Sequence, residues 1–385
     1  MNKNLKVYYW APFTSKVATI RAVINSAFSL EKYSKNKIKT KIIDASGEWS
    51  EYFDEIKKSN IGYIKLNNHQ FFEQKTGYFN TRLNFIKIFI KCFFPLKKLI
   101  QIEKPDYVII HLITSLPLVL NYILNLKTKM ILRVSGLPKM NFLRKLFWKI
   151  VLKKVFLITC PTEETRNDLL KYNFCKPDKI VVLFDPIINV KLINKYKKEN
   201  IVIKNEKNYF LAIGRFTKQK NFLFLLKVFS KLLEIENKSK LVLIGEGEKE
   251  SELKDFIFQK KLNNNISIIN YQKNIFPFIN KSKCFLLPSL WEDPGFVLIE
   301  NAYCNIPIIS SNCKNGPTEI LDYGKGGFLF NNNSEKEFLD KLIEFNQSKQ
   351  EEIKKKILFA KKKAKNFTIF SHYLRLKEIL YYDYK

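Results

Sequence analysis

Apolar and polar positions alternate along the chain in two kinds of segment. Short apolar runs, typical of buried parallel strands, are followed by longer stretches with the three-to-four-residue period of helices. Alternation of this kind predicts an α/β protein with doubly wound parallel sheets. The expected strands are 5–10, 40–44, 107–112, 129–134, 155–160 and 180–184 in the first half, and 209–213, 240–244, 266–269, 284–288, 306–310 and 327–330 in the second.

The pattern also predicts two domains. The 385 residues, 46% of them hydrophobic, suffice for two sizeable cores. Residues 189–208 are rich in Lys, Asn and Glu and lack a clear buried run until the next strand begins, which is typical of a domain boundary. We therefore expect one domain over 1–195, a second over 196–368, and a final aromatic, periodic helix over 369–385.

Charge narrows the class of partner. Lys and Arg number 67 against 36 Asp and Glu, a formal net charge of +31, and the pI is near 9.7. A surface of this sign attracts anions, so nucleic acid, anionic lipid and phosphorylated substrates all qualify. Charge alone does not choose among them.

Two stretches combine Phe, Trp, Leu and Ile with Lys and Arg and contain no acidic residue. Residues 84–100 and 141–156 have the composition of interfacial amphipathic helices, although a core-packed helix with a solvated basic face is the competing interpretation. Their presence in the same half favours contact with an anionic membrane surface. No apolar run approaches the roughly 20 residues of a membrane span, and the N-terminus has no signal-peptide core. We expect a cytoplasmic protein, peripheral at the membrane.

Cysteine usage and acidic motifs give no sign of a metal. The six cysteines are scattered, without a Cys-x-x-Cys pair or a nearby His cluster, so neither zinc nor disulfides are predicted. The chain also has no Asp-x-Asp motif that would suggest a divalent-ion site.

Two carboxylates flank a glycine where a strand gives way to a helix. Glu292 is expected in the loop after strand 284–288, and Glu300 one to two turns into the helix that an Asp-Pro-Gly turn opens. The first free amides of that helix would come from Gly295, Phe296 and Val297, and such amides attract anions. Ligands bind at this edge of open α/β sheets. Alternatively, Glu292 is a loop carboxylate and Glu300 an ordinary helix residue.

Basic residues follow the strand 209–213. Gly214 permits a tight turn, and Arg215 with Lys220 brings a forked donor and a point charge to the start of a helix. These two basic side chains together are suited to binding a diphosphate. A basic loop in a basic protein remains the plainer interpretation.

Two further glycine-bearing turns follow strands in the same domain. Gly245 stands in Gly-Glu-Gly after strand 240–244, where a ligand or the opposite domain could approach closely. Gly316 opens a Gly-Pro turn after strand 306–310, and Glu319 lies in the first turn of the following helix. Glu319 could equally serve the helix dipole or a ligand.

Together these turns resemble a known family. The motifs at 214–221, 245–247, 288–300 and 315–320 are similar in order and spacing to the retaining glycosyltransferases of family 4, which have the GT-B fold. The resemblance covers about 205–345. Segments at 11–26, 104–111, 135–138 and 160–162 look more loosely like the bacterial surface-polysaccharide branch.

The resemblance implies a fold and a set of roles. Two Rossmann-like doubly wound domains would face each other across a cleft, the second binding a nucleoside-diphosphate sugar, the first the acceptor, and the final helix would cross back to the first. Arg215 and Lys220 would neutralise the diphosphate leaving group, and Glu300 would bind the ribose. Glu292 and the amides of 295–297 would orient the donor sugar. Fixed cations and amides can stabilise the leaving group, so no metal and no cofactor are expected.

One histidine could belong to this site. His111 ends a buried-looking strand of the first domain and could face the cleft, touching the donor sugar or an acceptor hydroxyl. A histidine that merely caps a strand end is the alternative.

The resemblance, together with the charge and the two basic amphipathic stretches, implies a metal-independent retaining hexosyltransferase that extends a polyprenyl-diphosphate-linked glycan in the synthesis of capsule, O-antigen or a similar polysaccharide. A GT-B sugar-nucleotide epimerase or a soluble transferase with small acceptors would use the same nucleotide site. A nucleic-acid-binding protein would explain the charge, but no nucleic-acid motif is present, so no nucleic-acid partner is expected. Glycosidase chemistry needs carboxyls that flank the bond, and Glu292 and Glu300, expected at one helix entry, are poorly placed to flank it.

Overall fold

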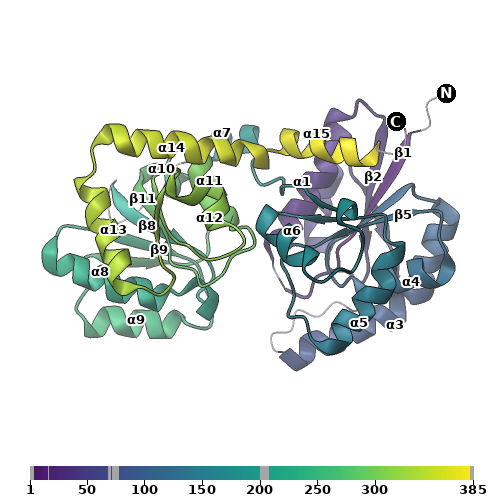
Figure 1. The fold of residues 1–385 in the computed structure, drawn as a ribbon, viewed down its shortest axis with the longest axis horizontal. Coiled ribbons are helices and arrows are strands. Elements are labelled where there is room, and N and C mark those ends of the chain that lie inside the picture. Colours follow the sequence, from purple (N-terminus) through teal and green to yellow (C-terminus); the bar gives the residue numbers. More distant parts are fainter. Residues whose placement is uncertain (1–3, 16, 68–70, 72–77, 200–207, 382–385) are drawn as a thin grey trace. The chain divides into compact units, whose positions relative to one another are not determined.

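The computed structural model describes residues 4–15, 17–67, 71, 78–199 and 208–381, with the side chains of 78–81 excepted. The chain forms two compact units (Figure 1). Met1–Ile187 and Ile369–Lys385 make up unit 1, and Ile188–Thr368 make up unit 2. Each unit is a parallel sheet with helices on both faces, so the expected α/β, doubly wound fold class is confirmed.

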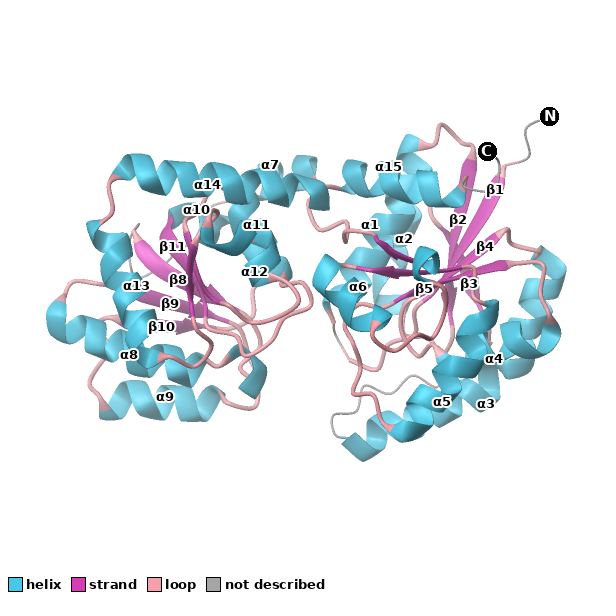
Figure 2. Ribbon diagram, viewed as in Figure 1, coloured by secondary structure: helices cyan, strands magenta, loops and turns pink. Residues whose placement is uncertain are grey.

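Unit 1 contains a seven-stranded sheet in the order β3-β2-β1-β4-β5-β6-β7, with every pair parallel (Figure 2). All of its strands are short and most are apolar, whereas β2 carries Lys39 and Lys41 and the β3 edge is only half-buried. They are β1 (Leu5–Trp10), β2 (Ile38–Asp44), β3 (Gly62–Lys65), β4 (Tyr107–Ile110), β5 (Lys129–Arg133), β6 (Leu157–Cys160) and β7 (Ile180–Val182).

Helices cover both faces of this sheet because side chains alternate along each strand. Tyr8 and Trp10 of β1 belong to the core on one face, and Val7 and Tyr9 to the core on the other. The first face carries α3 (Tyr78–Glu103), α4 (Ser115–Leu124), α5 (Phe142–Val151) and α6 (Glu163–Leu170). The second carries α1 (Ala18–Tyr33), α2 (Phe53–Lys58) and α15 (Ile369–Leu380).

Unit 2 contains a six-stranded parallel sheet in the order β10-β9-β8-β11-β12-β13. Its strands are β8 (Tyr209–Ile213), β9 (Leu241–Ile244), β10 (Ile266–Ile269), β11 (Ser282–Leu287), β12 (Ile308–Ser311) and β13 (Phe328–Phe330). One face packs on α8 (Phe222–Ile235), α9 (Glu250–Gln259) and α13 (Glu335–Gln347). The remaining helices are α7 (Val190–Tyr196), α10 (Phe276–Lys281), α11 (Phe296–Tyr303), α12 (Pro317–Ile320) and α14 (Gln350–Ala364).

In each sheet, the direction in which successive strands are added reverses once. In unit 1 the reversal lies between β1 and β4, and in unit 2 between β8 and β11. In open α/β sheets, ligands bind at the carboxyl ends of the strands at such a reversal.

The structure differs from the sequence-based expectations in a few places. β3 was not expected, because Gly-Tyr-Ile-Lys is a short, half-buried edge strand with no clear apolar run. Residues 188–195, expected in the first domain, fold with unit 2, where α7 packs on α10.

The final helix α15 packs on α1 in unit 1, and residues 382–385 lie outside the described part. All six cysteines are free.

Candidate functional site

The four glycine-bearing turns of unit 2 follow four neighbouring strands. In the sheet, β9, β8, β11 and β12 lie side by side, and all run in the same direction. The turns after them therefore meet at one edge. Contacts between successive turns show that they form one continuous cluster.

The first contact joins the turns after β8 and β9. A Cβ atom at Gly245 would lie 1.9 Å from the carbonyl oxygen of Gly214, so only glycine fits there. The Gly214 amide donates to Ile244, at 3.0 Å. Gly214 in turn packs on the side-chain stem of Lys220, which a Cβ atom would approach to 3.1 Å.

The second contact joins the turns after β8 and β11, where the sheet reverses direction. The Lys220 ammonium donates to Oε1 of Glu292 at 2.5 Å. Only 14% of the Lys220 side chain and 5% of the Glu292 side chain are exposed. Sequence analysis gave these residues separate roles, and the structure makes them a buried ion pair. An ammonium has three donors, so Lys220 can hold Glu292 and still donate to an anion.

The third contact joins the turns after β11 and β12. A Cβ atom at Gly316 would lie 2.0 Å from the carbonyl oxygen of Pro294. Gly295 has φ +94°, in the left-handed region that favours glycine, and lies next to the Glu292 side chain. Gly245, Gly214, Lys220, Glu292, Gly295 and Gly316 are thereby linked into one cluster at the carboxyl edge of the sheet.

Asp293 adds a second carboxyl to the cluster. Burial and, to a lesser extent, the neighbouring Glu292 carboxylate together raise its pKa to about 7, against a hydrogen bond with Asn315 that lowers it. Asp293 thus changes charge close to neutral pH. Sequence analysis did not single it out, although its position beside Glu292 in a turn was a usable signal.

Hydrogen-bond donors also belong to these turns. Helix α11 begins at Phe296, and no side chain among the described residues caps it, so the amides of Phe296 and Val297 keep their capacity to bind an anion. Arg215 is exposed, and no described residue pairs with its guanidinium. Glu300 lies half-buried on α11 and Glu319 half-buried on α12.

Several buried polar atoms near the cluster lack a hydrogen-bond partner within the described part of the chain. They are Thr217 Oγ1, Ser289 Oγ and Asp293 Oδ1. Buried polar atoms are satisfied in the great majority of folded proteins, so these three have the capacity to bind water or a polar ligand. A polar ligand with acceptors and donors would satisfy them.

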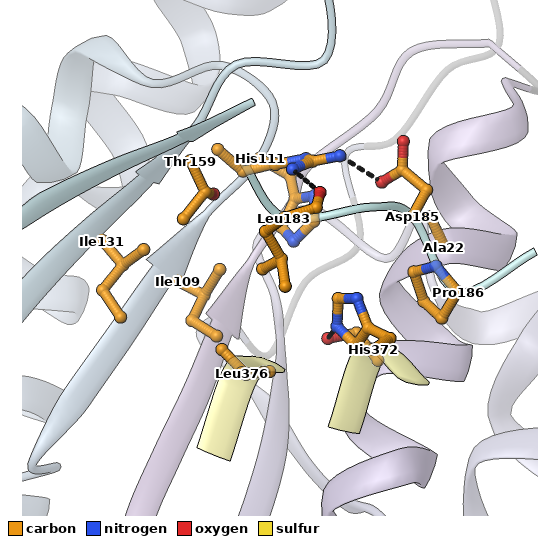
Figure 3. A pocket seen from close by; sticks show the side chains of 12 residues that line it. Ala22, Ile109, His111, Ile131, Thr159, Leu183, Asp185, Pro186, His372 and Leu376 are labelled. Atoms are coloured by element: carbon orange, nitrogen blue, oxygen red, sulfur yellow. Dashed lines mark hydrogen bonds and ion pairs between the residues drawn. The ribbon is translucent and has the colours of Figure 1, made fainter. Parts of the chain in front are cut away.

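His111 belongs to unit 1, where it follows β4 at the point of sheet reversal. Its amide donates to Trp10 at 2.9 Å, and its side chain lines a small cavity with Thr159, Asp185 and His372 (Figure 3). Burial lowers the pKa of His111 well below its usual range, and nearby Arg133 and His372 lower it further. The imidazole is therefore neutral, and Nδ1 has no hydrogen-bond partner among the described residues.

A buried polar network surrounds His111 that sequence analysis did not find. Arg133 contacts Oδ1 of Asp185 at 2.6 Å and donates to the carbonyl of Leu183. His372 lies 2.8 Å from Ser26 Oγ and 2.7 Å from the carbonyl oxygen of Phe184, and burial lowers its pKa to about 3. Arg133 sits in an apolar strand, and a charge there was a signal for a buried ion pair.

A metal centre is not evident in the part of the chain described. Among those residues no group of three or more His, Cys, Asp or Glu side chains is placed to hold an ion. Metal independence stays a prediction.

Both units of this chain are Rossmann-like, and in unit 2 the motifs gather where the sheet reverses. This combination is typical of proteins with the GT-B fold. The family follows from comparison with known sequences. Residues 194–365 match the family described as glycosyl transferases group 1. The expected resemblance to group 1 glycosyltransferases is thereby confirmed for residues 194–365.

Curated relatives agree with this assignment. An uncharacterized glycosyltransferase of Methanocaldococcus jannaschii is 30% identical over 255 residues, 60% of this chain and 62% of that protein. A Campylobacter jejuni N-acetylgalactosaminyltransferase, named for an undecaprenol-diphosphate-linked acceptor, is 25% identical over 53% of this chain and 56% of its own. The matches thus span little more than half the length of these relatives.

Solved structures show the same fold. A glycosyltransferase from Rickettsia africae has a TM-score of 0.75 with 19% identity, covering 100% of both chains. Anabaena HepE in complex with UDP and glucose has a TM-score of 0.70 with 12% identity, covering 98% of this chain and 99% of that one.

Proposed function

We propose that the protein is a retaining, family 4 glycosyltransferase that moves a sugar from a nucleoside-diphosphate sugar to a polyprenyl-diphosphate-linked glycan. The product would serve a bacterial surface polysaccharide such as capsule or O-antigen. The enzyme would act at the inner face of the cytoplasmic membrane, and unit 1 would bind the acceptor.

One observation carries this proposal: the buried Lys220–Glu292 pair lies where the unit 2 sheet reverses, beside the uncapped start of α11. When the bond between sugar and diphosphate breaks, negative charge develops on the leaving phosphate. Lys220, the exposed Arg215 and the amides of Phe296 and Val297 can stabilise that charge from fixed positions, without a metal. Glu292, held by Lys220, can accept hydrogen bonds from sugar hydroxyls.

The relatives' names support the acceptor class. Two further proteins are named for acceptors linked to undecaprenol through a diphosphate, a galactosyltransferase of Escherichia coli and a second N-acetylgalactosaminyltransferase of Campylobacter jejuni. His111, neutral and buried at the reversal of the unit 1 sheet, is proposed to contact the donor sugar or the acceptor hydroxyl.

A thermal-shift screen of UDP-, GDP- and ADP-sugars tests the donor site. We expect one donor class to raise the melting temperature, and Arg215→Ala and Glu300→Ala to abolish that shift. Lys218→Ala is the matched control, because Lys218 is an exposed cation of the same loop outside the predicted set. Equal losses in all three variants, or no shift with any donor, would overturn the proposed site.

Two activity measurements test the reaction itself. Nucleoside diphosphate should be released only when a glycolipid acceptor is supplied, and EDTA should leave the rate unchanged. Release without an acceptor would instead favour an epimerase or hydrolase, and a rate restored only by manganese would contradict metal independence.

A further inference from the structure

The outer side of helices α3, α4 and α5 exposes an unusual number of large apolar side chains. About half of all such exposed side chains among the described residues lie on these three helices. The three lie on one face of the unit 1 sheet, where α4 contacts both α3 and α5 (Figure 1). Exposed apolar groups gathered in this way mark an interaction surface.

Helix α3 is apolar on two opposite faces. Its inner face contributes Ile88 and Leu96 to the core. Its outer face carries a stripe at the three- and four-residue spacing of a single helix side: Leu83, Ile86, Ile90 and Phe94, between 55% and 72% exposed. One such face suffices to hold a surface helix on its domain, so the second needs another partner.

Helix α5 repeats the arrangement. Trp148 and Val151 pack into the core, while the outer side carries Phe142 and Leu143, 77% and 73% exposed, with Leu146 and Ile150 further along. We call the outer stripes of the two helices the basic apolar face; its apolar residues are Leu83, Ile86, Ile90, Phe94, Phe142, Leu143, Leu146 and Ile150.

The charges on this face have one sign. Over α3, α4, α5 and the 3-10 turn Leu152–Lys154 that follows, Glu103 is the single acidic residue, at the far end of α3. Exposed cations alternate with the apolar stripes: Lys87, Lys91, Lys98, Lys145, Lys149 and Lys153. Long basic side chains beside Phe, Leu and Ile are the composition of helices that lie in a membrane interface.

The direction of the helices places the starts of α3 and α5 near the carboxyl edge of the unit 1 sheet. Helix α3 leads from β3 into β4, and α5 from β5 into β6, so each begins near the carboxyl edge of the parallel sheet. Leu83, Phe142 and Leu143 therefore lie toward the edge at which His111 follows β4.

We propose that the basic apolar face docks unit 1 onto an anionic bilayer surface, with its apolar side chains inserted among the acyl chains and its lysines against acidic head groups. This deepens the membrane location proposed above, but it rests on side chains of unit 1, none of which belongs to the unit 2 cluster. No helix in the described ranges is long and apolar enough to span a bilayer. Nucleic acid would use the cations and leave the eight apolar side chains without a role.

Vesicle flotation with the full-length protein tests the proposal. Wild type should float with phosphatidylcholine vesicles containing phosphatidylglycerol, and weakly or not at all with phosphatidylcholine alone. The triple variant Phe142→Ser, Leu143→Ser, Leu146→Ser should lose at least about tenfold in affinity for the mixed vesicles. The triple variant Lys145→Gln, Lys149→Gln, Lys153→Gln should lose affinity and salt dependence together.

Matched controls come from unit 2, where Phe258, Leu358 and Phe359 are 75%, 65% and 45% exposed. The variant with Ser at these three positions should float like wild type. Failure of wild type to float, equal losses in both apolar triple variants, or preferential binding to DNA would overturn the docking surface. The sugar-nucleotide thermal shift should be the same in every variant, so failure of docking is distinguishable from failure of the donor site.

Discussion

The Lys220 ammonium and the Glu292 carboxylate lie 2.5 Å apart, with little of either side chain exposed. Moving two charges out of water is costly, and the attraction between them offsets that cost only while both are present. The pair therefore couples the turn after β8 to the turn after β11. A buried pair of this kind also holds Glu292 in one orientation, as its proposed role of binding the donor sugar requires.

The losses of stability from substituting the two partners should not be additive. Lys220→Met or Glu292→Gln alone should lower the free energy of unfolding by about 3 to 5 kcal/mol, because the other group is left buried without its partner. The double variant should cost clearly less than the sum of the two, measured by urea unfolding.

The exposed pair Lys254–Glu250 on α9 is the control for this coupling. Its side chains are 58% and 28% exposed, so each substitution there should cost under about 1 kcal/mol. Additive losses at Lys220 and Glu292 would contradict the coupling.

Asp293 should make stability depend on pH near neutrality. Its pKa is about 7 in the folded protein, against 3.8 for an ordinary aspartate, so the folded chain holds a proton between these values that the unfolded chain releases. Stability from this group is complete below pH 4 and falls as the pH rises through 7.

The variant Asp293→Asn mimics the protonated form and should raise the melting temperature at pH 8 while leaving it unchanged near pH 4. Asp255→Asn, on the exposed side of α9, should change it at neither pH. A melting temperature lowered by Asp293→Asn at pH 8 would mean that the ionised carboxylate stabilises the fold.

The sequence alone predicted which residues belong to the candidate site, but not that Lys220 and Glu292 pair. Gly214, Lys220, Glu292 and Gly316 stand after apolar runs, and that pattern is visible in the chain. The hydrogen bond between Lys220 and Glu292 depends on β8 and β11 being neighbours, which the order of segments does not reveal.

At the scale of elements, the turns of unit 2 are held together by backbone packed on backbone. The turn that opens α12 approaches the turn that opens α11 so closely that a side chain at Gly316 would collide with the Pro294 carbonyl. With φ 171°, Gly316 is in extended backbone that any residue adopts, so the requirement for glycine here is purely steric.

Gly316→Ala should therefore separate these two turns, lower stability by more than about 2 kcal/mol and reduce the sugar-nucleotide thermal shift. Gly324→Ala is the control, because a Cβ atom there would meet nothing within 4 Å, although φ is +96°. That substitution should cost only the roughly 1 to 2 kcal/mol of left-handed backbone and leave the ligand shift intact. A larger effect at Gly324 than at Gly316 would contradict the steric account.

Strands were predictable where the sequence has a clear apolar run. The strands 5–10, 209–213 and 266–269 were placed with the bounds that the structure shows. β3 escaped because an edge strand packs on one neighbour and needs little apolar character, so its sequence resembles a loop. Within α3 and α5, composition showed that both are amphipathic, but only the structure separates the apolar residues of the core from those left exposed.

At the scale of the whole molecule, the chain leaves unit 1, forms unit 2 and returns. Helix α15 completes unit 1: Tyr373, Leu376 and Leu380 are part of its core, and the Tyr107 hydroxyl donates to the carbonyl of Leu380. The end of the sequence is aromatic and periodic, which predicted a helix. Which core the helix joins was known only from the resemblance, because sequence periodicity carries no information about distant partners.

Unit 2 contains all four glycine-bearing turns and its own core, whereas residues 1–187 lack the last helix of theirs. Residues 188–368 expressed alone should therefore fold and keep the sugar-nucleotide thermal shift of the full chain. Residues 1–187 alone should stay unfolded or aggregate, since the surface of α1 and the sheet that α15 covers would be exposed. Fusing residues 369–385 to them through a flexible linker should restore cooperative unfolding, measured by circular dichroism. A stable 1–187 fragment would show that α15 is dispensable to that core, and loss of the ligand shift from a folded 188–368 fragment would show that donor binding needs residues of unit 1.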